Sequence, residues 1–247
     1  MSTKAEALRQ LHRPGKPLVL ANIWDAAGAK LVEAAGFDAV ATSSGAVAES
    51  LGHRDGQDAP AAEMLAVAAR IARAVALPVT VDAEAGYGLP PAELAARLLD
   101  AGIAGCNLED TDHSTHTLGD PARQADFIAA VRAAAGDALV INARVDAFVR
   151  AQQGTDERAV LPDAVERARA YLAAGADCVY PILVRDPEVV GEFTAAVAPA
   201  NVNVMGLPGT SIADYARLGV ARISLGTQVW RATQADLAAR LADIAAH

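Results

Sequence analysis

The sequence predicts an α/β protein with a TIM-type (β/α)8 barrel fold, in a single domain that spans residues 1–247. Three observations support this prediction. Short apolar segments alternate with longer, alanine-rich segments of helical periodicity, and the alternation occurs eight times. No linker or change in composition divides the chain. The same alternation is compatible with an open, doubly wound sheet, which is the alternative fold.

The predicted strands are apolar on both faces, which is typical of a parallel sheet that is buried on both sides. The segments between them, such as 61–75 and 125–136, carry apolar residues three and four positions apart and Arg or Glu on the opposite face, so we predict helices that cover the sheet. The strands are predicted, in order, at residues 17–23, 39–44, 78–84, 105–110, 138–144, 178–183, 201–207 and 222–226.

Every second strand is preceded by a helix that is predicted to end at a glycine. A glycine at the end of a helix adopts the left-handed conformation without the steric penalty that a Cβ atom imposes, so the chain can leave the helix and enter the strand within a few residues. These glycines, ahead of the second, fourth, sixth and eighth strands, are Gly36, Gly102, Gly175 and Gly219.

The acidic composition of the chain argues against a nucleic-acid partner. It carries 30 Asp and Glu against 21 Lys and Arg, whereas nucleic-acid binding depends on Lys and Arg that neutralise phosphates. No membrane partner is expected, because no apolar run reaches the about 18 residues of a membrane span and the N-terminal segment has no apolar signal core. Cys106 and Cys178 lie in separate apolar segments, so we predict reduced, buried thiols and a cytoplasmic location.

Carboxylates are concentrated where the functional side chains of such a barrel gather, at the carboxyl ends of the strands. Asp82 and Glu84 end the third strand, and because alternate residues of a strand share a face, both are predicted to point into the barrel mouth. Glu109 ends the fourth strand, and Asp55 is expected to reach the same place from the loop after the second. Such carboxylates repel one another unless a cation holds them, so the set predicts a Mg2+ site, with Mn2+ as an alternative.

Donor groups accompany these carboxylates. Arg144 ends the fifth strand, and its guanidinium is suited to holding a substrate carboxylate through two hydrogen bonds. Ser43, Ser44 and Gly45, after the second strand, offer hydroxyl and backbone N–H donors for a carboxylate or an oxyanion. The metal and these donors together predict a site for a small acidic ligand. A purely structural alternative stays open, in which Asp82 pairs with Arg144 and the serines form only a polar turn.

The segments that carry these residues resemble the isocitrate lyase and phosphoenolpyruvate mutase superfamily. The resemblance covers nearly the whole chain and rests on the combination of segments 18–56, 79–88, 105–110 and 141–148. It implies a (β/α)8 barrel that binds Mg2+ and a 2-oxo acid or enolate, and that cleaves or forms C–C or P–C bonds beside a pyruvyl-like unit. It also implies roles for individual residues: a direct metal ligand in Asp82, water-mediated metal contacts in Glu84, Glu109 and Asp55, and substrate contacts in Ser43, the Ser44 backbone and Arg144.

The loop after the fourth strand departs from the superfamily. Isocitrate and methylisocitrate lyases carry a Lys-Lys-Cys-Gly-His-type loop there, whose cysteine serves as an acid, whereas this chain has no cysteine at residues 109–120. The phosphoenolpyruvate mutases place a lysine after the Glu-Asp pair, where this chain has Thr111. Glu84 stands where many members carry aspartate. We therefore expect a Mg2+-dependent lyase that cleaves a C–C bond of a small 2-oxo acid or related dicarboxylate through a metal-stabilised pyruvate enolate, as oxaloacetate decarboxylation does, or in the manner of a methylisocitrate lyase.

Two other functions stay open. One is P–C chemistry of the phosphoenolpyruvate mutase or phosphonopyruvate hydrolase type, with Asp55 attacking or orienting a phosphonate, and the other is a non-catalytic 2-oxo acid binding protein. In the lyase, the enolate takes its proton from water or, if the loop closes, from His113 or His116. The helical C-terminus with Trp230 near its start predicts a homo-oligomer, a dimer or tetramer, and the resemblance implies that subunits exchange this helix.

Overall fold

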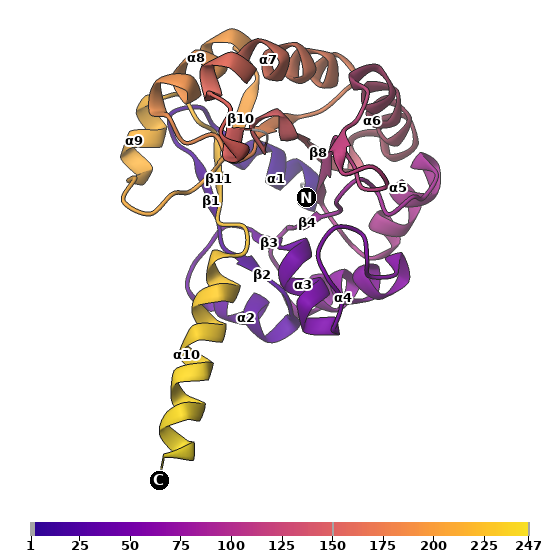
Figure 1. Ribbon diagram of the computed structural model, residues 1–247. Coiled ribbons are helices and arrows are strands. Elements are labelled where there is room, and N and C mark those ends of the chain that lie inside the picture. Colours follow the sequence, from indigo (N-terminus) through magenta and orange to yellow (C-terminus); the bar gives the residue numbers. More distant parts are fainter. Residues whose placement is uncertain (1–2, 150, 247) are drawn as a thin grey trace.

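The computed structural model describes residues 3–149 and 151–246, and its strands form a parallel barrel inside a ring of helices (Figure 1). The predicted (β/α)8 fold is confirmed. The first strand of the barrel is divided into β1 (Leu18–Leu20) and β2 (Asn22–Ile23). The other barrel strands are β3 (Val40–Thr42), β4 (Val79–Asp82), β5 (Gly105–Glu109), β8 (Val140–Val145), β9 (Cys178–Pro181), β10 (Asn201–Met205) and β11 (Arg222–Ser224).

The sheet closes on itself through its divided first strand. The residues of β1 pair with β11, those of β2 pair with β3, and Ala21 lies between the two segments. An open, doubly wound sheet would leave two unpaired edge strands, so that alternative is wrong. Each of the eight predicted strands is present, with ends that lie within a few residues of the predicted limits.

Helices follow the strands around the barrel as predicted. The four glycines before the even-numbered strands all have positive φ angles, between 76° and 103°, which confirms their role at the helix ends. The α-helices are α1 (Lys4–Leu11), α2 (Ala26–Ala34), α3 (Ser44–Leu51), α4 (Ala61–Ala74), α5 (Pro91–Asp100), α6 (Pro121–Ala135), α7 (Glu157–Ala173), α8 (Pro187–Val197), α9 (Ile212–Arg217) and α10 (Gln228–Ala245). Short 3-10 helices lie at Gly136–Ala138, Asp146–Val149 and Ala151–Gln153.

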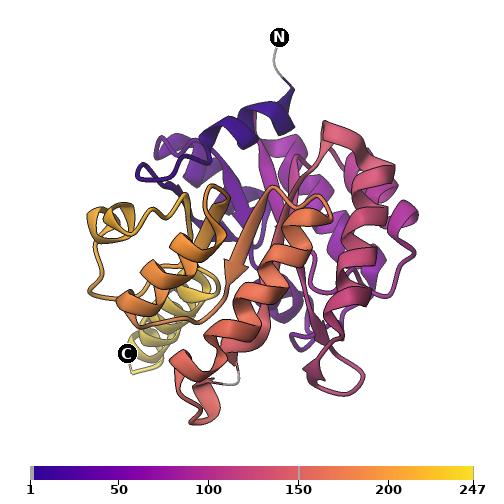
Figure 2. The same cartoon turned by 90° about the horizontal axis from the view of Figure 1, so that it is seen from above.

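Helix α1 covers the end of the barrel opposite to the carboxyl ends of the strands (Figure 2). Leu8 is fully buried there and packs with Leu18, Leu20 and Val140. His12 follows the helix and is also buried, with its Nδ1 atom 2.8 Å from the carbonyl oxygen of Leu8. Burial, with the charge of Arg222 nearby, lowers the pKa of His12 from 6.5 to about 4.

This buried histidine predicts a loss of stability in mild acid. In the unfolded chain His12 binds a proton near pH 6.5, whereas the folded protein resists protonation until about pH 4. The unfolded state therefore binds more protons across that interval, and the free energy of unfolding is expected to fall by about 3 kcal/mol as the pH falls through it. Urea unfolding across this interval measures the loss. His12→Gln should flatten the profile relative to the wild type, and parallel profiles would contradict the assignment.

The inner face of the barrel is more polar than the sequence analysis supposed. Asp82, Asn107 and Asn142 are neighbours across β4, β5 and β8, and Arg222 lies on β11. Barrels of this kind are usually filled by Val, Ile and Leu. The expectation of strands that are apolar on both faces is therefore wrong for the inner face of several strands, because polar residues occupy every second position within their apolar runs.

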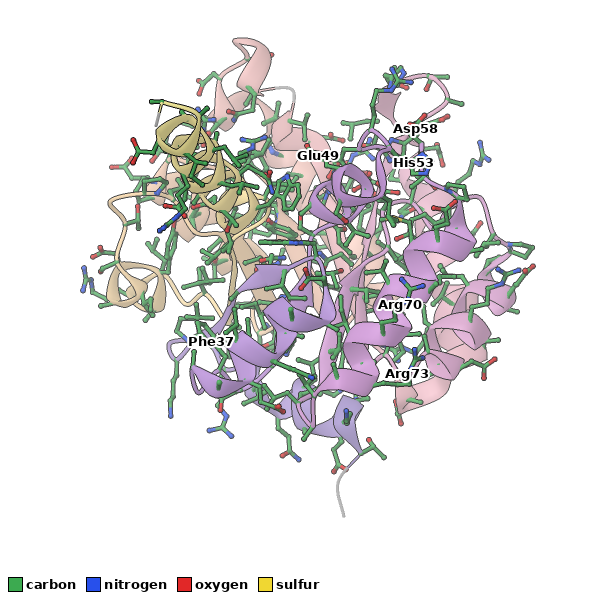
Figure 3. The ribbon with its side chains drawn as sticks, turned by 90° about the horizontal axis from the view of Figure 1, so that it is seen from below. Phe37, Glu49, His53, Asp58, Arg70 and Arg73 are labelled. Carbon is green, nitrogen blue, oxygen red and sulfur yellow. The ribbon has the colours of Figure 1, made fainter. Side chains whose placement is uncertain are left out.

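Helix α10 extends away from the barrel instead of completing the ring (Figure 1). None of its described residues is buried, and Leu237, Leu241 and Ile244 are 47%, 56% and 72% exposed. Its first turn is anchored, because the indole N–H of Trp230 donates to Glu49 of α3, which lies next to α10 in Figure 3. Across residues 3–149 and 151–246, no helix is both long and apolar enough to cross a membrane.

Candidate active site

The chain turns sharply at the end of β4. The strand ends at Asp82, and four of the next six residues have positive φ angles: 48° at Glu84, 88° at Gly86, 57° at Tyr87 and 67° at Gly88. The hydroxyl of Tyr87 donates to the carbonyl oxygen of Asp82 at 3.0 Å and closes the turn. The predicted extension of the strand to residue 84 is therefore wrong. The turn nevertheless buries Glu84 in the barrel mouth, where it is 3% exposed.

Asp82 has one carboxylate oxygen that lacks a partner. Its Oδ2 atom accepts from the hydroxyl of Ser44 at 2.8 Å and from the Ser44 backbone N–H at 3.4 Å. Its Oδ1 atom is buried and accepts no hydrogen bond from the residues that the structure describes. A buried carboxylate oxygen without a donor is unfavourable, and a bound cation would satisfy it.

The start of α3 brings further predicted site residues to Asp82. Ser43 is the N-cap of this helix, and its hydroxyl accepts from the N–H of Ala46. Ser44 lies between two acids, since its hydroxyl is also 3.3 Å from Oδ1 of Asp55. A Cβ atom at Gly45 would lie only 2.9 Å from Oδ2 of Asp55, so a glycine is required for this close approach.

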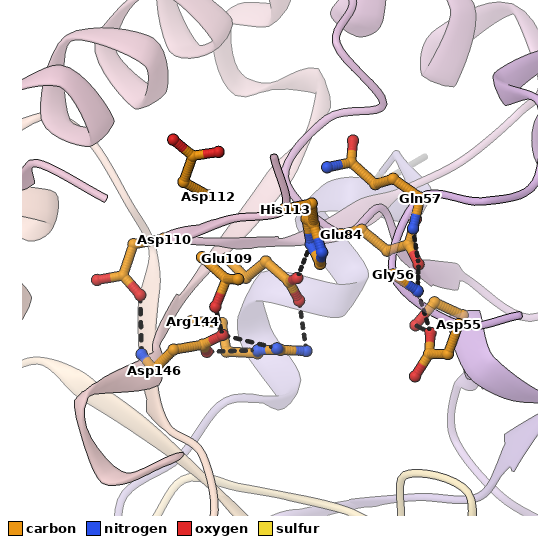
Figure 4. Close-up of polar contacts among 12 residues, drawn as sticks. Asp55, Gly56, Gln57, Glu84, Glu109, Asp110, Asp112, His113, Arg144 and Asp146 are labelled. Atoms are coloured by element: carbon orange, nitrogen blue, oxygen red, sulfur yellow. Dashed lines mark hydrogen bonds and ion pairs between the residues drawn. The ribbon is translucent and has the colours of Figure 1, made fainter. Parts of the chain in front are cut away.

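Glu84 completes a group of carboxylates at the mouth (Figure 4). It accepts hydrogen bonds from the backbone N–H groups of Gly56 at 3.2 Å and Gln57 at 3.1 Å. Burial raises the pKa of Glu84 to about 7, and the negative charges of Asp82, Glu109 and Asp55 contribute to the increase. The structure thus brings Asp82, Glu109 and Asp55, the other carboxylates that the sequence predicted, close enough to Glu84 to raise its pKa.

Glu109 and Arg144 form an ion pair across the ends of β5 and β8. The Nη1 atom of Arg144 lies 2.5 Å from Oε2 of Glu109, and its Nε and Nη2 atoms donate to Asp146 at 2.6 and 2.8 Å (Figure 4). The structural alternative in which Arg144 pairs with Asp82 is therefore wrong. Asp146 had no predicted role. The only sequence signal for it is its position two residues after the arginine.

Asp110 points away from the mouth. Its carboxylate accepts from the hydroxyl of Tyr171 at 2.6 Å, from Arg167 at 3.1 Å and from the backbone N–H of Asp146 at 2.8 Å. It therefore ties β5 to α7 and to the start of the 3-10 helix at Asp146–Val149. Of the adjacent Glu109 and Asp110, only Glu109 belongs to the site.

A short hairpin that the sequence analysis did not predict follows β5. Its antiparallel strands are β6 (Thr111–Asp112) and β7 (Thr117–Leu118). The hairpin folds back so that Nε2 of His113 lies 2.5 Å from Oε1 of Glu109, and this hydrogen bond raises the pKa of His113. His116 is exposed near the tip. Both histidines line the cavity beside Arg144, and the structure distinguishes them by the contact of His113 with Glu109.

The donor set fits a hydrated divalent cation. Within the described parts of the chain, no three His, Cys, Asp or Glu side chains converge closely enough to bind one ion directly. Mg2+ usually keeps several waters and needs only one or two direct carboxylates. The partnerless oxygen of Asp82 is suited to direct binding of such an ion, and the nearby carboxylates of Asp55, Glu84 and Glu109 could accept hydrogen bonds from its waters.

The chain is similar to known proteins over most of its length. The family model for phosphoenolpyruvate phosphomutase matches residues 8–245. The chain is 38% identical over 221 residues to an uncharacterized protein of Mycobacterium tuberculosis, covering 90% of this chain and 82% of that one. It is 31% identical over 234 residues to an oxaloacetate decarboxylase of Rhodopseudomonas palustris, covering 92% and 78%.

Solved structures share the whole fold. A candidate phosphonomutase from Burkholderia cenocepacia superposes with a TM-score of 0.91 at 45% identity, covering 96% of this chain and 98% of that one. A phosphonopyruvate hydrolase in complex with oxalate and Mg2+ superposes with a TM-score of 0.87 at 25% identity, covering 98% and 87%. The similar proteins thus include enzymes named for C–C and for P–C chemistry.

Proposed function

The chain belongs to the isocitrate lyase and phosphoenolpyruvate mutase superfamily, and we propose that it is a Mg2+-dependent lyase that cleaves a C–C bond of a small 2-oxo acid or related dicarboxylate. The observation that carries this proposal is the partnerless buried oxygen of Asp82, in a group of four carboxylates beside Arg144. Similarity to an oxaloacetate decarboxylase favours C–C cleavage. Pyruvate release from a panel of 2-oxo and 2-hydroxy dicarboxylates tests it.

The proposed roles of the residues follow from their contacts. Asp146 holds two nitrogens of Arg144, so the guanidinium keeps a fixed orientation and its Nη1 atom faces Glu109 and the mouth. A substrate carboxylate is expected to bind there. The hydroxyl of Ser43 and the N–H of Gly45, at the start of α3, offer further donors, while the N–H of Ser44 donates to Asp82 at 3.4 Å.

The carboxylates hold the cation in this proposal. Asp82 would hold Mg2+ or Mn2+ directly, Asp55, Glu84 and Glu109 would hold it through water, and the ion would supply positive charge against the negative charge that develops on the substrate. The N–H groups of Gly56 and Gln57 hold Glu84 in place for that contact.

The specificity of the enzyme is proposed to reside in the hairpin. A cavity of about 450 Å3 adjoins Arg144 and is lined by residues of β6 and β7, including Thr111 and Leu118, and by Val149. Its lining mixes charged, hydroxyl and apolar groups. The part of the substrate beyond its pyruvyl unit would therefore occupy this cavity.

We propose that His113 supplies the proton that the product enolate requires. It is the hairpin histidine that contacts Glu109, whereas His116 lies near the exposed tip. His113→Gln is expected to lower kcat for pyruvate formation about 10- to 100-fold, the usual size of a general acid effect. Thr115→Ala is the control, because Thr115 is an exposed hairpin residue that does not line the cavity, and it should leave kcat within about twofold. An unchanged rate when His113 and His116 are both replaced by Gln would exclude both histidines.

P–C chemistry is the second candidate. Similarity to a phosphonopyruvate hydrolase favours it, as does the position of Asp55, which approaches Ser44 beside Asp82. Phosphate release from phosphonopyruvate distinguishes it from C–C cleavage. If the protein binds a 2-oxo acid in the presence of Mg2+ but turns over neither class of substrate, the third candidate, a non-catalytic binding protein, is correct.

We also propose that α10 packs against a second copy of the chain. Helix α10 leaves its own barrel and carries one exposed apolar stripe. The stripe consists of Leu237, Leu241 and Ile244, which are spaced four and three residues apart and therefore share one face of the helix. Replacing all three by Gln is expected to convert a dimer or tetramer into a monomer in light scattering. A wild-type monomer, or an unchanged mass in the variant, would refute this proposal.

A further inference from the structure

An unpaired guanidinium lies inside the barrel. Arg222 on β11 is 1% exposed, and its Nη2 atom donates to Oδ1 of Asn107 at 3.1 Å. Its Nε and Nη1 atoms have no hydrogen-bond partner, and no carboxylate pairs with it, among residues 3–149 and 151–246. An apolar side chain would be less costly to bury at this position. A residue that lowers stability in this way points to a function and not to packing.

The contact with Arg222 fixes the orientation of the Asn107 amide. The oxygen and nitrogen of an amide have nearly the same shape, so their assignment depends on their partners. A guanidinium can only donate, so the Asn107 atom that faces Arg222 must be the oxygen. Asn142 donates to the same oxygen at 2.8 Å. The amide nitrogen of Asn107 therefore points away from both partners, and it donates to no residue that the structure describes.

The free amide nitrogen lies at the floor of the candidate site. Asn107 is the register partner of Asp82 on β4, and it precedes Glu109 by two residues, so its side chain is on the same inward face. It is 6% exposed, whereas Asn142 is fully buried. Because α1 closes the opposite end of the barrel around Leu8, the mouth is the open side.

We infer that Asn107 donates a hydrogen bond to an oxygen of the bound substrate and that Arg222 is a positioning residue that fixes the direction of this donor. The inference rests on the proposed function and extends it to the floor of the site. A neutral N–H donor there is suited to a carboxylate or enolate oxygen, which is a strong acceptor without a hydrogen of its own.

Oxalate binding in the presence of Mg2+, measured by calorimetry, tests the role of Asn107. Oxalate offers only acceptor oxygens, and a phosphonopyruvate hydrolase of the same fold binds it together with Mg2+. Asn107→Asp retains the oxygen that accepts from Arg222 and Asn142 but loses the N–H group at the mouth. Asn107→Leu removes the donor without adding charge. Both variants are expected to weaken oxalate binding about tenfold or more.

Arg222→Met tests the positioning role, alone and together with Asn107→Leu. The single replacement is expected to weaken oxalate binding about fivefold while the Tm stays equal or rises, a combination that a purely structural role would not produce. In the Asn107→Leu background the same replacement should change binding by less than about twofold, because the donor that it orients is already gone.

Each outcome decides a different point. If the wild type binds oxalate and neither Asn107→Asp nor Asn107→Leu changes its affinity, the inference about Asn107 is wrong, whereas the proposed function still stands. If Arg222→Met weakens oxalate binding by the same factor in the wild type and in the Asn107→Leu variant, Arg222 does not act by positioning Asn107. If the wild type neither binds oxalate nor turns over any 2-oxo acid, the proposed function fails, and this inference fails with it.

Discussion

Asp82→Ala is expected to lower kcat/KM for pyruvate formation by about a thousandfold or more, while the protein stays folded. Asp82 provides the carboxylate oxygen that is buried without a partner, so it is the residue best suited to bind the cation directly. Loss of that charge stabilisation should raise the activation barrier by about 4 kcal/mol, since each 1.36 kcal/mol is about tenfold in rate. Pyruvate release, with Mg2+ and with EDTA, measures the effect.

Two further variants separate metal binding from structural effects. Asp82→Asn retains an oxygen for the hydroxyl of Ser44 but lacks the negative charge, so it should be nearly as inactive as the alanine variant. Asp100→Ala removes an exposed acid from the last residue of α5, at the amino ends of the strands, and should retain full activity. EDTA should abolish wild-type turnover, and added Mg2+ or Mn2+ should restore it. Asp82→Ala that keeps more than about a tenth of wild-type activity would contradict the proposed metal site.

The barrel could be predicted from the sequence because its main determinants are local. Buried apolar residues recur along the strands, and the helices ahead of every second strand end at a left-handed residue, which glycine at positions such as Gly36 and Gly175 supplies. Gly86 and Gly88 predict a tight turn after the third strand, but the early end of that strand at Asp82 could not be predicted, because it depends on the hydrogen bond of Tyr87 to the strand end and on positive φ at Glu84. The hairpin after β5 was missed for a similar reason, since its strands have only two residues each.

The approach of Asp55, Glu84 and Glu109 to Asp82 followed from topology, because the carboxyl ends of neighbouring parallel strands meet at one edge. The pairing of Arg144 did not follow from topology, because several carboxylates lie near the strand ends and only the geometry shows that Arg144 pairs with Glu109 and Asp146 and not with Asp82. The polar inner layer was readable but overlooked. Asn107 lies two positions before Glu109 within an apolar run, which is the spacing of one strand face.

Arg144→Lys is the second variant with a large expected effect, a loss of about a hundredfold or more in kcat/KM. The guanidinium donates from three nitrogens, to Glu109 on one side and to Asp146 on the other. A lysine ammonium is a single point charge on a flexible stem and cannot hold both acids and a substrate carboxylate in that geometry. Steady-state kinetics should show the loss in kcat/KM. A lysine variant within about threefold of the wild type would contradict the proposed substrate contact.

Arg144→Met separates the catalytic from the stabilising contribution of the same side chain. It leaves buried Asp146 without its counter-charge and leaves buried Glu109 with only the contact to His113, so the free energy of unfolding at neutral pH should fall by about 3–5 kcal/mol. Adding Asp146→Asn removes one of the stranded charges and should recover part of that loss in urea unfolding. Activity should not recover, because the substrate still lacks its guanidinium. If activity and stability recovered together, Arg144 would act only by holding the fold.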